Sequence, residues 1–203
     1  PRTRGATVRL VLDLRKVSSH HDRRRLASEA DQHGIWGTVV TGPPGAECVE
    51  AAAIAAVTSN ISIIVDVDGD AAHPTTLAEE VAVLDQISRR RTALIFRGAT
   101  ATKLRVVALL SGLSSHGVIL SPPPAQTSVP VFAPEDMPEA DLEGDLANSA
   151  TVIDQYRDAN TPFLIVSWGR PIKELARHLV GRAASPDFPQ MVADLADEID
   201  PIE

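Results

Sequence analysis

Short apolar segments recur along this chain and are separated by longer amphipathic ones. The clearest of them is 61–67, which is β-branched, nearly continuous and short, as expected for a parallel strand buried on both faces. Residues 7–14 begin with apolar–polar alternation and then run apolar, which is typical of a strand that enters a core. The same criteria predict further strands at 38–41, 92–96 and 163–167.

The amphipathic segments that follow these strands predict helices. A helix is expected at 20–33, because Ser18 or Ser19 can cap its start and Gly34 can end it. Proline at its first position and a one-sided apolar pattern predict another helix at 74–88. Further helices are predicted at 47–57, 103–113, 172–180 and 188–199, and 141–160 is predicted to be mostly helical.

This strand–helix alternation predicts parallel strands joined by crossover helices, in either a doubly wound sheet or a β/α barrel. No G-x-G-x-x-G motif follows a predicted strand, which favours the barrel. A proline-rich connector at 121–130, flanked by short apolar segments at 117–120 and 129–132, is not expected to be helical. A complete (β/α)₈ barrel typically needs about 250 residues, and this chain has 203. We therefore predict one domain over residues 1–203, an α/β fold that is a compact or incomplete (β/α) TIM-type barrel.

Composition narrows the class of function. The formal charge of −8, from 19 Lys and Arg against 27 Asp and Glu, argues against a general nucleic-acid binder. No apolar run reaches the ~20 residues that span a bilayer, and no signal-peptide pattern precedes the first charges, so a cytoplasmic location without membrane contact is expected. The single cysteine, Cys48, permits no internal disulfide. Its acidic neighbours Glu47 and Glu50 make a catalytic thiolate unexpected.

Three local patterns between residues 26 and 98 are similar to those of a known enzyme superfamily. The first is A-S-E-A-D-Q-H-G-I-W at 27–36, the second is A-A-V-T-S-N-I at 55–61, and the third runs from His73-Pro74 through L-D-Q-I-S to Arg91. In this order and spacing they resemble the N-terminal half of the bacterial luciferase-like flavin monooxygenases. That superfamily also holds deazaflavin (F420)-dependent reductases and dehydrogenases. Beyond residue 100 the resemblance is confined to P-P-A-Q at 123–126, V-P-V at 129–131 and the strand at 163–166.

The resemblance implies a luciferase-like barrel that has lost part of its C-terminal half, because the interval between 131 and 163 is too short for a complete barrel. It also implies an FMN or F420 cofactor across the mouth formed by the carboxyl ends of the strands, where the active sites of barrels lie. Non-catalytic flavoproteins of truncated build occur in the same superfamily, so the shortening bears on function.

Arg97-Gly98, directly after the predicted strand 92–96, is the first candidate for a cofactor contact. A guanidinium can bind a phosphate through two hydrogen bonds, and a glycine lets backbone N–H groups approach it. In bacterial luciferases the matching arginine of a C-R-G motif contacts the flavin phosphate, so the resemblance implies this role for Arg97. The alternative is an ordinary surface arginine.

The loop after strand 61–67 is rich in carboxylates and reads Asp66-Val67-Asp68-Gly69-Asp70. Members of the superfamily pack the isoalloxazine ring against the bulge after this strand, so the resemblance implies that residues 66–69 contact the flavin. Alternate carboxylates suit a hard cation as well, but Thr75 stands where a calcium loop needs glutamate, and no metal is assigned. A solvated acidic turn is the third interpretation.

The loop after the last predicted strand offers three more polar or aromatic groups. Ser167 supplies a hydroxyl, Trp168 an indole that could stack on a ring, and Arg170 a guanidinium for phosphate. A helix-start loop without a ligand is the alternative. Thr41, at the end of strand 38–41, completes the set of expected cofactor contacts.

No catalytic residue is assigned. Luciferases carry E-H-H after the second strand, where a histidine serves the oxygen chemistry, and this chain has Gly42-Pro43-Pro44 there. Neither proline nor glycine can act as a general base. His20 and His21 lie just beyond the first strand, but the start of a helix explains them better.

Two hypotheses of different class remain. The first is a luciferase-like flavin- or F420-dependent oxidoreductase, in which the cofactor carries out the redox chemistry on a small organic substrate. The second is a degenerate barrel that serves as a partner subunit or a passive flavin binder. A third option is a barrel that binds another phosphorylated metabolite at the same arginine. A homodimer or heterodimer is expected, because an incomplete barrel exposes strand edges and apolar surface. The superfamily packs its dimers through helices that correspond to 47–57 and 77–87.

Overall fold

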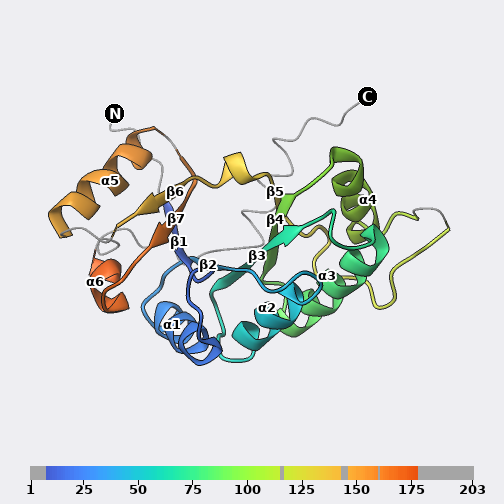
Figure 1. Ribbon diagram of the computed structural model, residues 1–203, viewed down its shortest axis with the longest axis horizontal. Coiled ribbons are helices and arrows are strands. Elements are labelled where there is room, and N and C mark those ends of the chain that lie inside the picture. The colour runs from blue at the N-terminus through green and yellow to red at the C-terminus, as the bar shows by residue number, and fades with distance from the viewer. Residues whose placement is uncertain (1–7, 115–116, 143–145, 160, 178–203) are drawn as a thin grey trace.

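The computed structural model of the protein describes residues 8–114, 117–142, 146–159 and 161–177. A single sheet lies at the centre, and all of its paired strands are parallel (Figure 1). The order across the sheet is β5 (Val131–Phe132), β4 (Thr92–Arg97), β3 (Ser62–Asp68), β2 (Gly37–Val40), β1 (Arg9–Asp13), β7 (Phe163–Ser167) and β6 (Glu139–Asp141).

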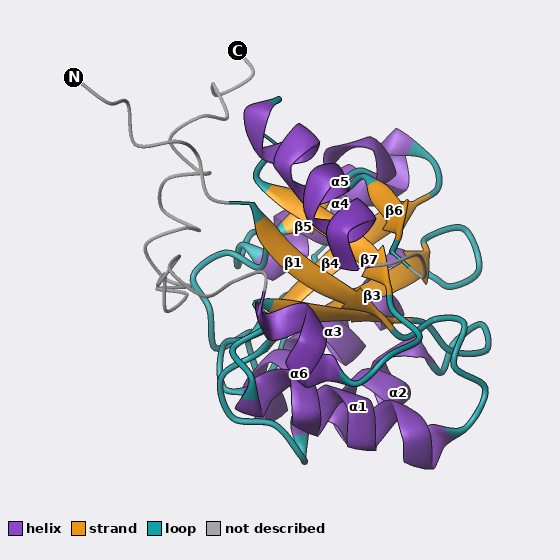
Figure 2. Cartoon of the chain, turned by 90° about the vertical axis from the view of Figure 1, so that its left-hand side faces the viewer, coloured by secondary structure: helices purple, strands orange, loops and turns teal. Residues whose placement is uncertain are grey.

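Helices surround the outer face of this sheet. Figure 2 shows α1, α2, α3 and α6 together on one side of the strands. Within the described ranges, no helix is both long enough and apolar enough to cross a membrane. The helices are α1 (His20–Gln32), α2 (Glu47–Ala55), α3 (Pro74–Ser88), α4 (Thr100–Leu110), α5 (Leu146–Asp158) and α6 (Ile172–Arg177).

The sheet must curl, because its two edge strands are neighbours in the sequence. Strands β5 and β6 are joined by residues 133–138, which include the 3₁₀ helix η1 (Pro134–Asp136). In a flat sheet of seven strands the two edges would stand about 29 Å apart, whereas this connection reaches at most about 25 Å even when fully extended. Figure 1 shows η1 bridging the opening between β6 and β5. The result is an incomplete barrel, open between these two strands.

Successive side chains along each strand point to opposite faces of the sheet, and they form two separate apolar layers. The outer layer lies between sheet and helices and includes Leu10, Leu12, Ile63, Val65 and Leu94. The inner layer fills the barrel, so the interior is a packed core rather than a pore. Its aromatic residues touch one another, with ring centroids 4.9 Å apart for Trp36 and Phe163 and 5.3 Å apart for Phe132 and Phe163. The other members of this layer are Val11, Val39, Ile64, Ala93, Ile95, Met137 and Ile165.

Several residues of the patterns that carry the family resemblance lie at the amino-terminal ends of the strands. Asp31, near the end of α1, accepts hydrogen bonds from the backbone N–H groups of residues 59–61 at 2.7–3.0 Å. Arg91, directly before β4, is buried and donates to backbone carbonyls of residues 55, 58, 61 and 88. Burial lowers the pKa of Arg91.

Asp85 and Gln126 form a second buried connection at this end. The carboxylate of Asp85 in α3 accepts hydrogen bonds from the backbone N–H and the side-chain amide of Gln126, both at 2.7 Å. The same amide donates to the carbonyl of Thr92 at 2.8 Å, so the proline-rich connector is tied to α3 and β4. These motif residues therefore hold the fold together at the end opposite the mouth, the end of a barrel that serves stability.

Most predicted elements are confirmed within a few residues. The hydroxyl of Ser19 accepts a hydrogen bond from the N–H of Asp22 at the start of α1, and Gly34 follows its end with a φ of 74°. The segment 141–160, predicted to be mostly helical, contains α5 at Leu146–Asp158, while residue 141 ends β6, a strand that was not predicted. Helix α4 begins at residue 100 rather than 103. The helix predicted at 188–199, and the end of that predicted at 172–180, lie outside the described residues.

Candidate functional site

The inward-facing positions of three strands change from apolar to charged at the carboxyl end. Successive inward positions in a strand are two residues apart, so the residue that follows the last apolar one by two faces the mouth. The pairs are Val11 and Asp13 in β1, Ile64 and Asp66 in β3, and Ile95 and Arg97 in β4.

These residues join Arg15 and Glu139 in what we call the mouth cluster: Asp13, Arg15, Asp66, Arg97 and Glu139. Nε and Nη2 of Arg15 each donate to one oxygen of Asp13 at 2.9 Å. Nη1 donates to Asp66 at 2.7 Å, and Nη2 also donates to Glu139 at 2.7 Å. A single guanidinium therefore connects β1, β3 and β6 across the mouth.

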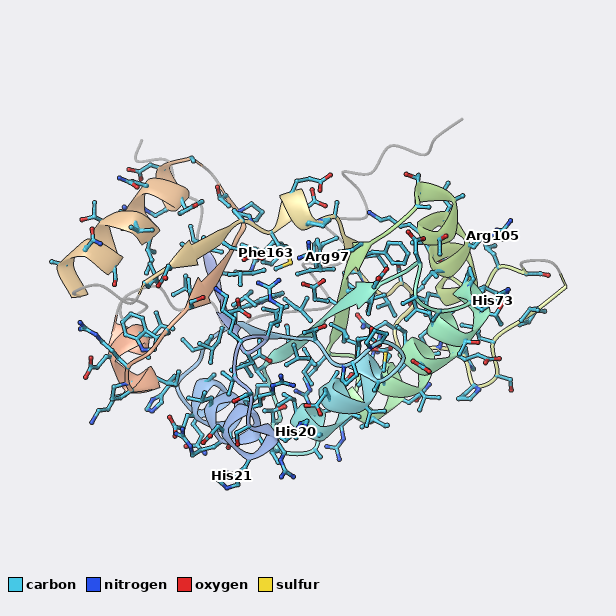
Figure 3. The ribbon with its side chains drawn as sticks, viewed as in Figure 1. His20, His21, His73, Arg97, Arg105 and Phe163 are labelled. Atoms are coloured by element: carbon cyan, nitrogen blue, oxygen red, sulfur yellow. The ribbon has the colours of Figure 1, made fainter. Side chains whose placement is uncertain are left out.

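Arg97 shares Asp66 with Arg15. Its Nε and Nη2 donate to the two carboxylate oxygens of Asp66 at 2.7 and 2.9 Å, a bidentate pair. Its Nη1 makes no hydrogen bond with any described residue, and 48% of its side chain is exposed, against 8% for Asp66. Figure 3 shows Arg97 inside the ring of helices, while Arg105 lies on α4 at the outside. One edge of the Arg97 guanidinium is thus open to a ligand.

The mouth cluster is buried at one side and open at the other. The side chains of Asp13 and Arg15 are 2% and 13% exposed, whereas half of the Glu139 side chain is exposed. Burial alone would lower the pKa of Arg15, but its hydrogen bonds with Asp13, Asp66 and Glu139 outweigh burial and raise that pKa. The hydrogen bonds to Asp66 likewise raise the pKa of Arg97. With three carboxylates and two guanidiniums, the formal charge of the cluster is −1.

The acidic loop after β3 is tied to the start of α4. The carboxylate of Asp68 accepts a hydrogen bond from the N–H of Asp70 at 3.0 Å, and the carboxylate of Asp70 accepts one from the N–H of Ala99 at 3.2 Å. Gly69 has no room for a side chain, since a Cβ there would lie 1.9 Å from Cζ of Phe96. Gly98 adopts a φ of 139° beside Asp70. The backbone N–H of Ala99 is therefore occupied by the protein's own carboxylate.

Two of the residues predicted to contact a cofactor face away from the mouth. Val67 and Trp168 are both buried in the outer apolar layer, and the indole N–H of Trp168 donates to the carbonyl of Pro171 at 3.2 Å. This placement argues against stacking of Trp168 on a ligand ring at the mouth. The roles assigned to both residues stay predictions that the structure does not favour.

Ser167 and Thr41 do lie at the mouth. Oγ of Ser167 is 3.5 Å from Nζ of Lys16, and the hydroxyl of Thr41 donates to the backbone carbonyl of Asp66 at 3.1 Å. Arg170 is half-buried in the loop after β7 and makes no hydrogen bond or ion pair with any described residue. Cofactor binding by Ser167, Thr41 and Arg170 stays a prediction, as it does for Arg97, Gly98 and residues 66–69.

The alternative of a metal at the acidic loop finds no support in the described residues. Asp66 is engaged by two guanidiniums and Asp70 by a backbone N–H. In the described part of the chain, no group of three or more His, Cys, Asp or Glu side chains is arranged to hold a metal ion.

Cys48 is inert, as the sequence predicted. It lies buried in α2, and burial raises the pKa of its thiol to about 12, with further contributions from Glu80 and Glu47. A thiol that stays protonated at neutral pH is not a nucleophile.

Three members of the mouth cluster were not predicted from the sequence: Asp13, Arg15 and Glu139. The signal for the first two was present in the D-L-R end of the first strand, where an inward aspartate is followed two residues later by an arginine. Glu139 gave no signal, because it stands 124 residues from Arg15 in a segment without strand propensity.

The comparisons with known proteins find likeness in structure only. No protein-family model matches the chain, and no curated protein matches its sequence. The monooxygenase RslO1 from Streptomyces bottropensis superposes with a TM-score of 0.53 at 16% identity, covering 92% of this chain and 83% of its own.

Two further solved structures are similar to the same degree. The EDTA monooxygenase EmoA from Chelativorans sp. BNC1 gives a TM-score of 0.52 at 14% identity, covering 95% of this chain and 70% of its own. The third is a riboflavin lyase, RcaE, whose structure holds modified FMN and riboflavin. It gives a TM-score of 0.52 at 12% identity, covering 79% of this chain. The match spans 62% of the lyase. The chain therefore shares the fold of these two monooxygenases and of the riboflavin lyase, and the resemblance seen in its sequence motifs is confirmed at the level of the fold.

Proposed function

We propose that this chain binds FMN or F420 at the mouth of its incomplete barrel and acts as a flavin- or F420-dependent oxidoreductase on a small organic substrate. The observation that carries the proposal is the half-exposed guanidinium of Arg97 at the carboxyl end of a strand, the end at which barrels bind their ligands. Support comes from the shared fold, because two of the similar structures are named monooxygenases and the third contains modified FMN.

The residues present fit a phosphate at one edge of the mouth. Asp66, held in turn by Arg15, fixes the orientation of Arg97 and leaves Nη1 for a phosphate oxygen. The half-buried Arg170 supplies a second positive charge in the loop after β7. A cofactor phosphate would thus bind at the exposed edge of Arg97 rather than enter the carboxylate side of the cluster.

Bound FMN or F420 supplies the redox chemistry, and the protein supplies orientation and a defined electrostatic environment. The hydroxyls of Thr41 and Ser167 lie at the ends of their strands and offer hydrogen bonds at fixed positions.

Equilibrium titration of FMN and F420, followed by quenching of tryptophan fluorescence, tests the proposal. We expect saturable binding at micromolar concentration that Arg97→Ala weakens by at least tenfold, about 1.4 kcal/mol. Arg105→Ala is the matched control, because Arg105 is an exposed arginine on α4 away from the mouth (Figure 3). Absence of binding for both cofactors, or equal losses in the two variants, would contradict the proposal.

A second candidate function is that of a partner subunit or passive flavin binder. It is favoured by the pairing of the mouth carboxylates with Arg15, which leaves Asp13 and Asp66 unsuited to proton transfer. The open edges β5 and β6 also offer a surface that a second chain would cover, in a homodimer or heterodimer.

Two measurements separate the candidates. Turnover of the reduced cofactor by the isolated chain, lost together with binding in Arg97→Ala, supports the enzyme. Binding without turnover, together with sedimentation as a dimer or a requirement for a second chain, supports the partner subunit. If inorganic phosphate or a sugar phosphate binds, if Arg97→Ala weakens that binding, and if neither cofactor binds, the site takes another phosphorylated metabolite.

A further inference from the structure

A second polar cluster lies at the outer edge of the mouth, where α1 and α2 begin. We call His20, Arg23 and Glu50 the rim cluster. Nδ1 of His20, the first residue of α1, lies 2.6 Å from Oε1 of Glu50 in α2. Nη1 of Arg23 donates to Oε2 of the same carboxylate at 3.1 Å. Figure 3 shows His20 where the two helices meet.

Glu50 is held rigidly in this cluster. Its side chain is largely buried, as is that of Arg23. Arg23 is itself fixed by donation to the backbone carbonyls of Val17 and Thr41. Burial alone would raise the pKa of Glu50, but the hydrogen bonds from His20 and Arg23 outweigh it and hold that pKa below its ordinary value. Glu50 is therefore an ionised acceptor at neutral pH.

An ionised carboxylate decides which nitrogen of His20 carries the proton. A carboxylate can only accept hydrogen bonds, so the neutral imidazole places its proton on Nδ1 and keeps the lone pair on Nε2. His20 is 69% exposed, so Nε2 is accessible. A carboxylate that fixes the tautomer of a histidine in this way determines which ring nitrogen is left to accept a proton.

The rim cluster is connected to the mouth cluster through one residue. Thr41 accepts a hydrogen bond from Arg23 through its carbonyl and donates one through its hydroxyl to the carbonyl of Asp66. Because α1 and α2 follow the carboxyl ends of β1 and β2, both clusters lie at the same end of the barrel. The mouth carboxylates are paired with guanidiniums, whereas His20 offers an accessible proton acceptor.

We propose that His20 is the acid–base residue of this site, with Glu50 as its positioning residue. Nε2 accepts a proton from a hydroxyl or N–H group of the organic substrate, Nδ1–H stays bonded to Glu50, and the imidazolium formed is balanced by that carboxylate. The proton returns from Nε2 to product or solvent, which restores the neutral imidazole. This inference rests on the proposed function, since the substrate would lie beside the FMN or F420 bound at the mouth.

The tautomer of His20 is tested first, in the protein without cofactor. Nitrogen-15 NMR at neutral pH should show the Nδ1–H form for His20, and Glu50→Gln should lower its share by at least half. His21 is the matched control, because it is the next residue and its side chain is 81% exposed. Its Nδ1 lies 4.0 Å from Oδ1 of Asp22. Its tautomer mixture should not respond to Glu50→Gln. A dominant Nε2–H form in wild-type His20 would overturn the proposal, whether or not a cofactor binds.

The position of His20 at the ligand is tested by acylation with diethyl pyrocarbonate, followed by mass spectrometry. Saturating FMN should slow modification of His20 at least fivefold and change that of His21 less than twofold. Equal rates at His20 with and without bound FMN would overturn the acid–base role while leaving flavin binding intact. Failure of FMN and F420 to bind at all would instead overturn the proposed function, and the acid–base role with it.

Discussion

Replacement of Arg15 by methionine tests whether buried charge holds the mouth together. The change removes four side-chain hydrogen bonds and leaves Asp13, whose side chain is 2% exposed, without a cation. Removing one partner of a buried ion pair typically costs 3–5 kcal/mol. Asp66 keeps Arg97, and the exposed pair with Glu139 contributes little. We therefore expect a loss near the lower bound, about 3 kcal/mol in the free energy of unfolding.

Urea denaturation measures this loss as a fall in the midpoint at unchanged slope. The control is Arg25→Met, which removes a pair of equal length, 2.7 Å to Glu29, whose two side chains are both exposed; no change in the midpoint is expected there. The double variant Asp13→Asn/Arg15→Met removes both charges and should recover part of the loss. If Arg15→Met and Arg25→Met shift the midpoint equally, the reasoning about burial is refuted.

Three further changes have definite expected outcomes. Burial and the neighbouring Glu47 raise the pKa of Glu80, so the folded state binds its proton more tightly than the unfolded chain and stability rises as the pH falls through that pKa. Glu80→Gln should therefore stabilise the protein at neutral pH and flatten the dependence of the urea midpoint on pH; an unaltered profile would contradict this. Thr38 has a buried hydroxyl that finds no hydrogen-bond partner among the described residues, so Thr38→Val should raise the free energy of unfolding by about 1 kcal/mol, and a decrease would count against it. Gly69→Ala should lower the free energy of unfolding by about 1–3 kcal/mol, because the added Cβ collides with Phe96. The double variant Gly69→Ala/Phe96→Leu should recover part of this loss, and no recovery would contradict the collision as the cause.

The fold was predictable because it is determined by local sequence patterns and by positions that accept few residue types. Residues 61–67 are apolar and β-branched, so they have few alternatives to a buried parallel strand, and β3 is found there. The motif residues Asp31 and Arg91 occupy positions where one carboxylate or guanidinium satisfies several backbone groups at once. Such positions restrict the residue type, and this is why the resemblance pointed correctly to the fold.

The mouth cluster was predicted only in part, because its geometry depends on distant parts of the chain. Arg97 and Asp66 were identified separately, as a phosphate contact and a ring contact, but their bidentate pairing requires the register between β3 and β4. Strand β6 is three residues long and contains two acidic residues, so only its pairing with β7 makes it a strand. Glu139 could not be brought to Arg15 without that pairing.

The two candidates at the end of β7 can be separated by strand alternation alone. Ser167 and Trp168 are consecutive at the end of this strand, and consecutive side chains point to opposite faces. A serine at the mouth therefore places the tryptophan in the outer layer, where it is found. The prediction that joined these two residues as ligand contacts did not take this alternation into account.

The most direct test of the central claim compares FMN with riboflavin, which lacks the phosphate. If Arg97 binds the phosphate, the wild-type protein should bind FMN at least tenfold more tightly than riboflavin, and Arg97→Ala should bring the two affinities to within about twofold. Arg105→Ala should leave the preference unchanged. Equal affinities in the wild-type protein, or a preference for FMN that survives Arg97→Ala, would contradict the assignment of Arg97 to the cofactor phosphate.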